Sequence, residues 1–251
     1  MKLDFIKEIS TELIGIDGGN INSKLWFCGI EWIPFKLKDY PQFSHKMKGI
    51  EIPYSHIDVR GWSFDRNIGT IVSGWNNTDG QNFNYDKNEK NIFKLNLFPL
   101  KAENTLDWSD CNFTRTGCAL KSEYYGKCVK YRFPLLHKLV TTFEPRVIVC
   151  LGREFIKEFI YAFWRLQNAI DNVKISKYKK DFKDSRVKYN SISNKIHVYQ
   201  NEDNDKLPVI IGLPFFGPYL NSHKDMKKIG NYIAEFYPDT LKLDEKKGIV
   251  I

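Results

Sequence analysis

Four short apolar runs, rich in β-branched or aromatic residues, stand out along the chain, and Gly, Pro or Asn bounds each of them. They are residues 24–30, 92–97, 146–151 and 208–213. These lengths and flanks are typical of β-strands. Since the runs are apolar at almost every position, we expect strands that are covered on both faces, as in a parallel sheet between helices. A fifth segment, 195–200, alternates and predicts an edge strand.

Three longer segments repeat their apolar positions at helical spacing, which predicts amphipathic helices over residues 130–143, 154–170 and 224–236. The stripes consist of Leu135, Leu136, Leu139 and Val140; of Phe155, Ile156, Phe159, Ile160 and Phe163; and of Met226, Ile229, Ile233 and Phe236. Pro238 follows the last segment, where a helix is expected to stop. The alternation of strands and helices predicts a three-layer α/β/α fold around a central, mostly parallel sheet of four to five strands.

Two stretches interrupt this pattern. Residues 74–91 are rich in Asn, Asp and Gly, and residues 174–195 are rich in Lys and Arg with Asp181 and Asp184 as their only acids. Neither is long enough to form a domain, and no repeat is visible. We therefore expect residues 1–251 to form a single α/β domain with irregular insertions near 74–91 and 174–195.

Composition narrows the class of protein. The 251 residues are 42% hydrophobic and 15% aromatic, which favours a globular protein over a disordered one. There are 38 Lys and Arg against 30 Asp and Glu, so the net charge of +8 favours a polyanionic partner. No apolar run approaches the ~20 residues of a membrane span, and no leader pattern opens the chain, so we expect a cytoplasmic protein. Two of the five cysteines, Cys28 and Cys150, lie in apolar runs, which predicts buried thiols and no disulfide framework.

Polar and helix-opening residues follow the predicted strands. Glu31 comes directly after the first strand, Asn96 stands near the end of the second, Gly152 opens a helix after the third, and a Pro- and Gly-rich aromatic loop, 213–221, follows the fourth. In open α/β sheets, ligands bind beyond the carboxyl ends of the strands. If the strands are parallel and adjacent, one crevice collects a carboxylate, an amide, a helix start and this loop.

In this order the residues resemble the uracil-DNA glycosylase superfamily. Residues 29–31, Gly-Ile-Glu, stand where that superfamily has a Gly followed two places later by the polar residue that positions water. Asn96 matches the Asn that pairs with the flipped base. Residues 145–152, Pro-Arg-Val-Ile-Val-Cys-Leu-Gly, match a run that closes a strand before a helix. Residues 213–215, Leu-Pro-Phe, take the place of a motif that is often His-Pro-Ser.

The resemblance implies a glycosylase that flips a deaminated or modified base out of single- or double-stranded DNA and hydrolyses its N-glycosidic bond. It implies Glu31 and Asn96 as catalytic residues. The residues expected around the base are Gly29, Ile30, Trp32, Phe35, Asn96, Leu213 and Phe215. The residues expected to contact DNA are Gly217, Tyr219, Leu220, Asn221, His223, Lys179 and Lys180. Hydrolysis of this kind needs no cofactor, and because Cys111, Cys118 and Cys128 lack tightly spaced pairs, we expect neither an iron–sulfur cluster nor another metal. We expect a monomer without a membrane partner.

Leu213 departs from the resemblance, because many members carry a catalytic histidine there. Without it, the leaving base loses a charge-assisted hydrogen bond of ~1.5–3 kcal/mol. The target base therefore stays open, and so do two other functions: a catalytically silent nucleic-acid-binding protein of the same fold, and a hydrolase of a small nucleotide. Simpler roles also exist for the two polar residues, since Glu31 can accept hydrogen bonds from a helix N-terminus and Asn96 can cap the turn before Pro99.

Overall fold

The structure is a computed structural model of the chain. It describes residues 3–11, 15–31, 63–75, 92–100, 108, 110–166, 187–193, 195–214 and 223–238. Within these residues, the fold is mixed α/β with one sheet.

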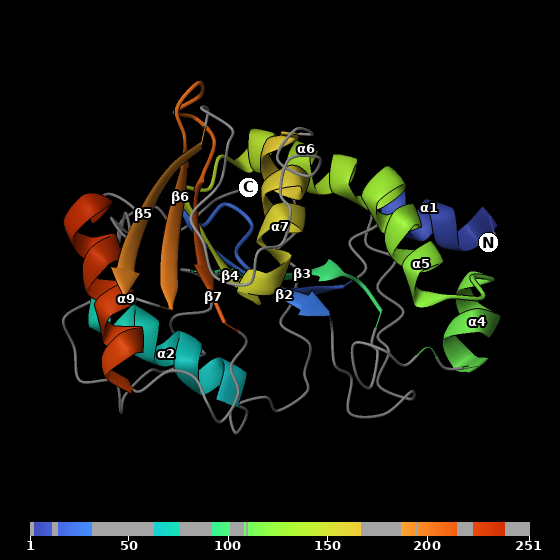
Figure 1. Ribbon diagram of the computed structural model, residues 1–251, viewed down its shortest axis with the longest axis horizontal. Helices are drawn as coiled ribbons and strands as arrows, with labels where there is room; N and C mark the ends of the chain where they lie inside the picture. The colour runs from blue at the N-terminus through green and yellow to red at the C-terminus, as the bar shows by residue number, and fades with distance from the viewer. Residues whose placement is uncertain are drawn as a thin grey trace.

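Seven strands form this sheet in the order β1-β3-β2-β4-β7-β6-β5 (Figure 1). Their bounds are β1 Ile16–Gly19, β2 Leu25–Glu31, β3 Phe93–Phe98, β4 Val147–Leu151, β5 Val187–Ser193, β6 Ile196–Asn201 and β7 Val209–Leu213. The four central strands, β3, β2, β4 and β7, are parallel to one another. The outer strands β1, β6 and β5 join by antiparallel pairing.

The four apolar runs are confirmed as the four central strands, but the expected strand count of four to five is too low. The segment expected as an edge strand, 195–200, is β6 and lies inside the sheet, between β7 and β5. The edge beyond it is β5, which comes from the stretch 174–195 that we expected to be irregular. The charged and polar residues of this segment did not predict a strand. An edge strand has one unpaired edge and an exposed face, so it needs few apolar residues. Residues 174–186 and 76–91 lie outside the described part, and residues 74–75 belong to a helix.

The described residues also form nine helical segments. They are α1 Leu3–Thr11, α2 Ser63–Trp75, α4 Asp110–Thr116, α5 Lys121–Lys127, the π-helical segment η4 Cys128–Arg132, α6 Phe133–Phe143, the short 3₁₀ turn η5 Arg153–Phe155, α7 Ile156–Trp164 and α9 His223–Phe236. The predicted helix 130–143 is the second part of a continuous helical run that begins at Lys121. The predicted helix 154–170 ends earlier, at Trp164, where Arg165 adopts a left-handed backbone with φ of 58°.

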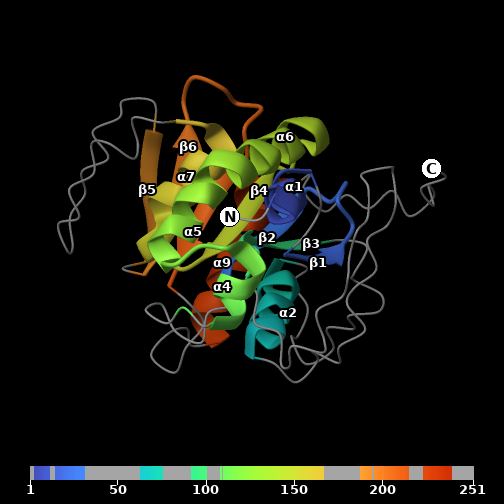
Figure 2. The same cartoon turned by 90° about the vertical axis from the view of Figure 1, so that its right-hand side faces the viewer.

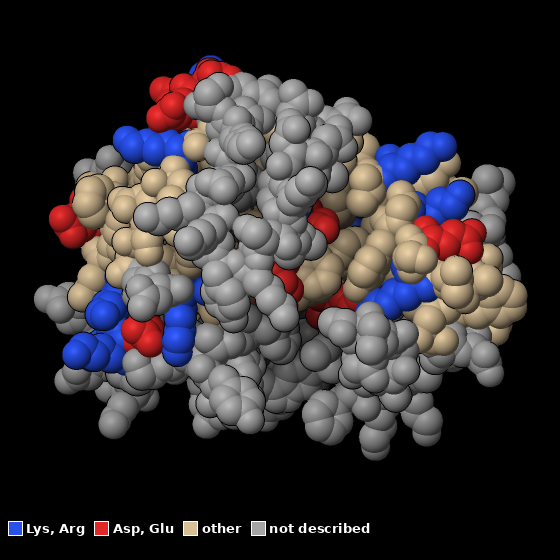
Figure 3. All heavy atoms as spheres, viewed as in Figure 1, with Lys and Arg blue, Asp and Glu red and all other residues tan. Residues whose placement is uncertain are grey.

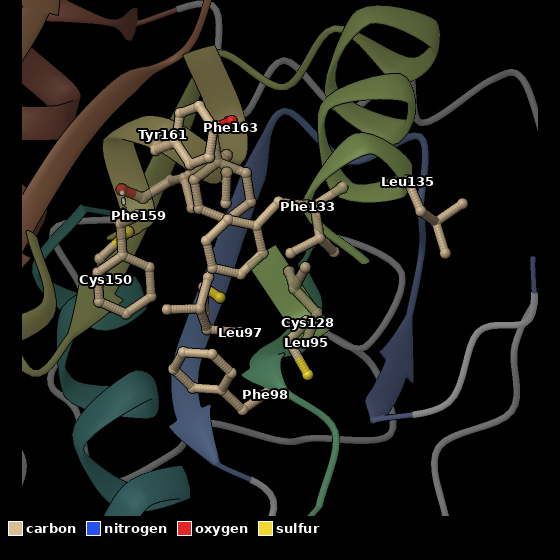
Figure 4. Close-up of a cluster of buried hydrophobic side chains, with 14 of the residues drawn as sticks. Leu95, Leu97, Phe98, Cys128, Phe133, Leu135, Cys150, Phe159, Tyr161 and Phe163 are labelled. Carbon is tan, nitrogen blue, oxygen red and sulfur yellow. Dashed lines mark hydrogen bonds between the residues drawn. The ribbon is translucent and has the colours of Figure 1, made fainter. Parts of the chain in front are cut away.

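Two hydrophobic clusters pack against the central strands. On β2, Trp26 and Cys28 belong to the first cluster, while Leu25 and Phe27 belong to the second. Because successive strand residues point to opposite faces, the clusters lie on opposite faces of the sheet. Helices α1, α5, α6 and α7 contribute to the first cluster, and α2 and α9 to the second (Figure 2). Figure 4 shows part of the first cluster, where aromatic side chains of α6 and α7 meet β3.

Two further predictions concern buried positions. Cys28 and Cys150 are confirmed as buried free thiols, as are Cys118 and Cys128, while the Cys111 side chain lies outside the described part. Phe236, which we expected in the core stripe of its helix, is 55% exposed and packs on Tyr232 at the end of α9. Among the described residues, no helix is long and apolar enough to cross a membrane.

Candidate active site at the carboxyl ends of β2 and β4

The sheet has a topological switch point between β2 and β4, where the order in which the chain adds strands changes direction. From β2 the chain adds β3 on one side, then crosses back to add β4 and β7 on the other side. In doubly wound sheets, ligands bind in the crevice outside the carboxyl ends of the strands at this switch point. The residues that end β2 and follow β4 are therefore the first candidates for a functional site.

Glu31 is the last residue of β2, and its carboxylate lies in a largely protein-lined position. Its Oε1 accepts a hydrogen bond from the Tyr125 hydroxyl at 2.5 Å and pairs with Lys121 Nζ at 2.9 Å. The Glu31 side chain is 12% exposed and that of Lys121 is 7% exposed. A buried ion pair of this kind holds only when geometry and hydrogen bonding are good, so the carboxylate of Glu31 is held in one place.

Helix α5 delivers both partners of Glu31 from one side. Lys121 and Tyr125 are four residues apart, so they lie on the same face of the helix, and Lys121 Nζ lies 5.3 Å from the centre of the Tyr125 ring. The Tyr125 ring stacks on Phe98, with ring centres 4.1 Å apart. Phe98 is the register partner of Glu31 on β3, so the stack fixes the hydroxyl beside the end of β2.

The surroundings keep Tyr125 in its neutral, hydrogen-donating form. Burial raises the pKa of Tyr125 well above its ordinary value, and the hydrogen bond to Glu31 and the charge of Glu31 raise the pKa further. The negative charge of Glu158 on α7 acts in the same direction. Tyr125 therefore stays a phenol that donates to a carboxylate, and it lies within electrostatic reach of a second one.

The other side of the site is built by the turn after β4 and the start of α7. Gly152 has φ of 111°, and a Cβ there would lie 2.2 Å from Ile30 Cδ1, so the tight turn requires glycine. The turn places Phe155 edge-on to Phe98 and to Tyr125, with ring centres 6.1 and 6.3 Å apart. Figure 3 shows acidic atoms in the middle of this face, between α7 and α5, with basic atoms on both flanks.

Glu158, on the first turn of α7, is the second carboxyl group on this side. Its Oε2 is buried and has no hydrogen-bond partner among the described residues. Burial raises the pKa of Glu158, while its own backbone N–H and the charge of Lys157 oppose this shift. The site thus combines an ion-paired carboxylate with a carboxyl group whose charged form is disfavoured.

Asn96 lies on β3 next to the site, two residues before the strand ends. Its register partner on β2 is Gly29, so no side chain stands beside it on that strand. Its side-chain amide donates a hydrogen bond to the backbone carbonyl of Gly15 at 3.3 Å. Its backbone carbonyl accepts a hydrogen bond from the buried Arg132 side chain at 2.9 Å. The first contact ties β3 to the turn before β1, which is a structural role. That Asn96 reads a base stays a prediction.

Two residues expected around the base have core positions. Leu213 is fully buried in the cluster shared with α2 and α9, because alternation along β7 points it to that face. Ile30 is 8% exposed and packs at Gly152. The structure gives both side chains packing roles, and that they line a base-binding pocket stays a prediction.

The remaining predicted site residues lie outside the described part of the chain. They are Trp32, Phe35, Lys179, Lys180, Phe215, Gly217, Tyr219, Leu220, Asn221 and the side chain of His223. Their predicted roles stay predictions.

Sequence reasoning missed Lys121, Tyr125 and Glu158. Tyr125 and Glu31 are 94 residues apart in the sequence, and no short-range sequence pattern indicates that they are in contact. Elsewhere in the sheet, His197 Nδ1 on β6 lies 2.5 Å from the Tyr189 hydroxyl on β5.

Among the residues that the structure describes, no group of three or more His, Cys, Asp or Glu side chains is arranged to hold a metal ion. No protein-family model matches the chain, and no curated protein matches it.

Proposed function

We propose that this protein is a DNA glycosylase-like hydrolase that takes a deaminated or modified base out of the DNA stack and hydrolyses its N-glycosidic bond. The observation that carries the proposal is the Glu31 carboxylate, held by Lys121 and Tyr125 at the topological switch point of the sheet. The resemblance of residues 29–31, Asn96 and 145–152 to the uracil-DNA glycosylase superfamily supports it.

The chemistry asks for a carboxylate near the sugar. As an N-glycosidic bond breaks, positive charge develops on the sugar and negative charge on the base. Glu31 stabilises the sugar cation and orients the attacking water, and Lys121 and Tyr125 fix the direction of its carboxylate without taking part in the reaction. Asn96 lies on the neighbouring strand β3, two residues before the position that pairs with Glu31, which is about 7 Å along the strand direction.

The proposed fold, partner and cellular location are those expected from the sequence. The fold is proposed to be a three-layer α/β/α sandwich, supported by the two helix-lined clusters on opposite faces of the sheet. The partner is DNA, supported by the net charge of +8, and the location is the cytoplasm.

One observation favours a second candidate, a nucleic-acid-binding protein without catalysis. Leu213 occupies the place where the resemblance expects a histidine, and it is fully buried. A carboxylate tied to Lys121 is also compatible with a purely structural ion pair.

Base release measured as alkali-labile abasic sites separates the two candidates. The substrates are single- and double-stranded oligonucleotides that carry uracil, deaminated purines or modified pyrimidines. Glu31→Gln is the test variant, and Glu235→Gln, an exposed position on α9, is the matched control. We expect the wild-type protein and the control to release at least one base, and Glu31→Gln to bind DNA with unchanged salt dependence but to release none.

Other outcomes decide between the alternatives. Salt-dependent binding without release of any base would contradict the glycosylase and favour the binding protein. Release that persists in Glu31→Gln would show that a different group carries the reaction.

A further inference from the structure

Glu158 lies on α7, near enough to Tyr125 for its negative charge to raise the pKa of that phenol. It follows Phe155 by three residues, and residues at this spacing lie on the same side of a helix or 3₁₀ turn. Phe155 presents that side edge-on to the Tyr125 ring, whose hydroxyl contacts Glu31. Glu158 therefore lies on the side of its helical segment that carries Phe155, the residue in edge contact with Tyr125.

The two carboxyl groups differ in their partners. Glu31 has an ammonium group at 2.9 Å and a phenol donor. Glu158 has a buried Oε2 that accepts no hydrogen bond from the described residues. If Glu158 is protonated there, no protein acceptor competes for its proton. If it is ionised, the buried oxygen has no hydrogen-bond donor to stabilise its negative charge.

The charged and titratable groups around Glu158 come from three elements. Lys157 on its own helix favours the carboxylate, and the pKa of Lys157 is itself lowered by burial. Tyr125 on α5 interacts electrostatically with Glu158, and it donates a hydrogen bond to Glu31 on β2. DNA that covers the site adds phosphate charge and removes water, and both changes favour the neutral form further.

We propose that Glu158 is the general acid of the reaction, which gives its carboxyl proton to the departing base while Glu31 acts as the carboxylate. This inference rests on the proposed function. It assigns the two halves of the charge separation to two residues: Glu31 serves the sugar, and Glu158 serves the base. Two carboxyl groups whose environments differ in this way are a common arrangement for acid and base roles.

The reaction balances with water as the only other reactant. The bond between the sugar C1′ and the base nitrogen breaks, and its electron pair stays with the base, which takes the proton of Glu158. Water forms the new C1′–O bond and gives a proton to the Glu31 carboxylate. Exchange with solvent then returns the proton from Glu31 and reprotonates Glu158.

The leaving group offers a test that a structural role for Glu158 would not pass. The wild-type protein, Glu158→Gln and the control Glu154→Gln, an exposed position one turn earlier, are compared under single turnover. The substrates are the base released most rapidly in the abasic-site assay and its halogenated analogue, whose anion is more stable. Since a stable anion needs less help from an acid, we expect Glu158→Gln to slow the parent base by about 10²–10⁴-fold and the analogue by less than ~10-fold.

The pH profile and a conservative variant complete the test. In the wild-type protein, release of the parent base falls as pH rises and Glu158 loses its proton, and this alkaline limb disappears in Glu158→Gln. Glu158→Asp, which retains an acid, should restore part of the rate. Thermal unfolding establishes that each variant is folded.

Distinct outcomes overturn the two proposals. Equal slowing of both substrates by Glu158→Gln, or an unchanged alkaline limb, overturns the general-acid role while leaving the glycosylase in place. A wild-type protein that releases no base overturns the proposed function, and the role of Glu158 falls with it.

Discussion

The α5 side and the α7 side of the proposed site treat the same kind of group in opposite ways. On the α5 side, Lys121 and Tyr125 bring a cation and a hydrogen-bond donor to the Glu31 carboxylate. On the α7 side, Glu158 is desolvated, and its Oε2 has no hydrogen-bond partner among the described residues. The comparison teaches that residue type does not decide the role of a carboxyl group, because its neighbours set the balance between charged and neutral forms.

Removing the cation from the α5 side should have the largest effect. Lys121→Met leaves the Glu31 carboxylate in a position that is only 12% exposed, without its ammonium partner. We expect a loss of about 3 kcal/mol in the free energy of unfolding, since breaking one half of a buried ion pair leaves an uncompensated charge. Urea unfolding measures this, with Lys127→Met at the end of α5 as the control. A loss no larger than that of the control would mean that the pair does not stabilise the fold.

Straining the α7 side should have the next largest effect. Gly152→Ala places a side chain where φ is 111° and where a Cβ would lie 2.2 Å from Ile30 Cδ1. We expect a loss of about 2 kcal/mol in the free energy of unfolding. The double variant with Ile30→Val removes the opposing methyl group and should recover part of this loss. An unfolding midpoint that does not change in Gly152→Ala would contradict the turn geometry.

Deleting one hydroxyl on the α5 side should have a smaller effect. Tyr125→Phe retains the stack on Phe98 but removes the hydrogen bond to Glu31. Hydrogen bonds to charged groups contribute about 1.5 kcal/mol or more, so we expect a loss of that size in the free energy of unfolding. Tyr131→Phe on η4 is the matched control. If both variants lose the same amount, the hydroxyl of Tyr125 has no special partner.

Neutralising the α7 side should have the smallest effect on stability, and it should depend on pH. Burial raises the pKa of Glu158 in the folded protein above its ordinary value of 4.5. The folded state therefore binds more protons than the unfolded state as pH rises from 4.5 to the folded-state pKa, so stability falls across that window. Glu158→Gln removes this fall. We expect the variant and the wild-type protein to differ more in thermal stability at neutral pH than at pH 4, with the variant gaining as pH rises.

The central strands and several helices were predictable because their signals are local. The run of residues 146–151 is apolar at nearly every position, and it forms β4, which is buried on both faces. The helical spacing of Phe159 and Phe163 likewise matches the packed face of α7. The edge strand β5 was not predictable, since its residues become a strand only by pairing with β6.

The candidate site was predictable in part for the same reason. Glu31 could be found because it directly follows a recognisable strand, and strand ends are where α/β sheets bind ligands. Its partners could not be found, because a contact between residues 94 positions apart leaves no periodic trace in the chain.

The order of residues along the chain is enough to predict an α/β protein with four buried strands and a carboxylate at the end of the first of them. The strand order, the approach of α5 to Glu31 and the desolvation of Glu158 emerge only when the chain is folded. The physical reason is that burial patterns and turn residues act over a few positions, whereas the charge state and the partners of a side chain depend on elements that packing brings together from distant parts of the chain.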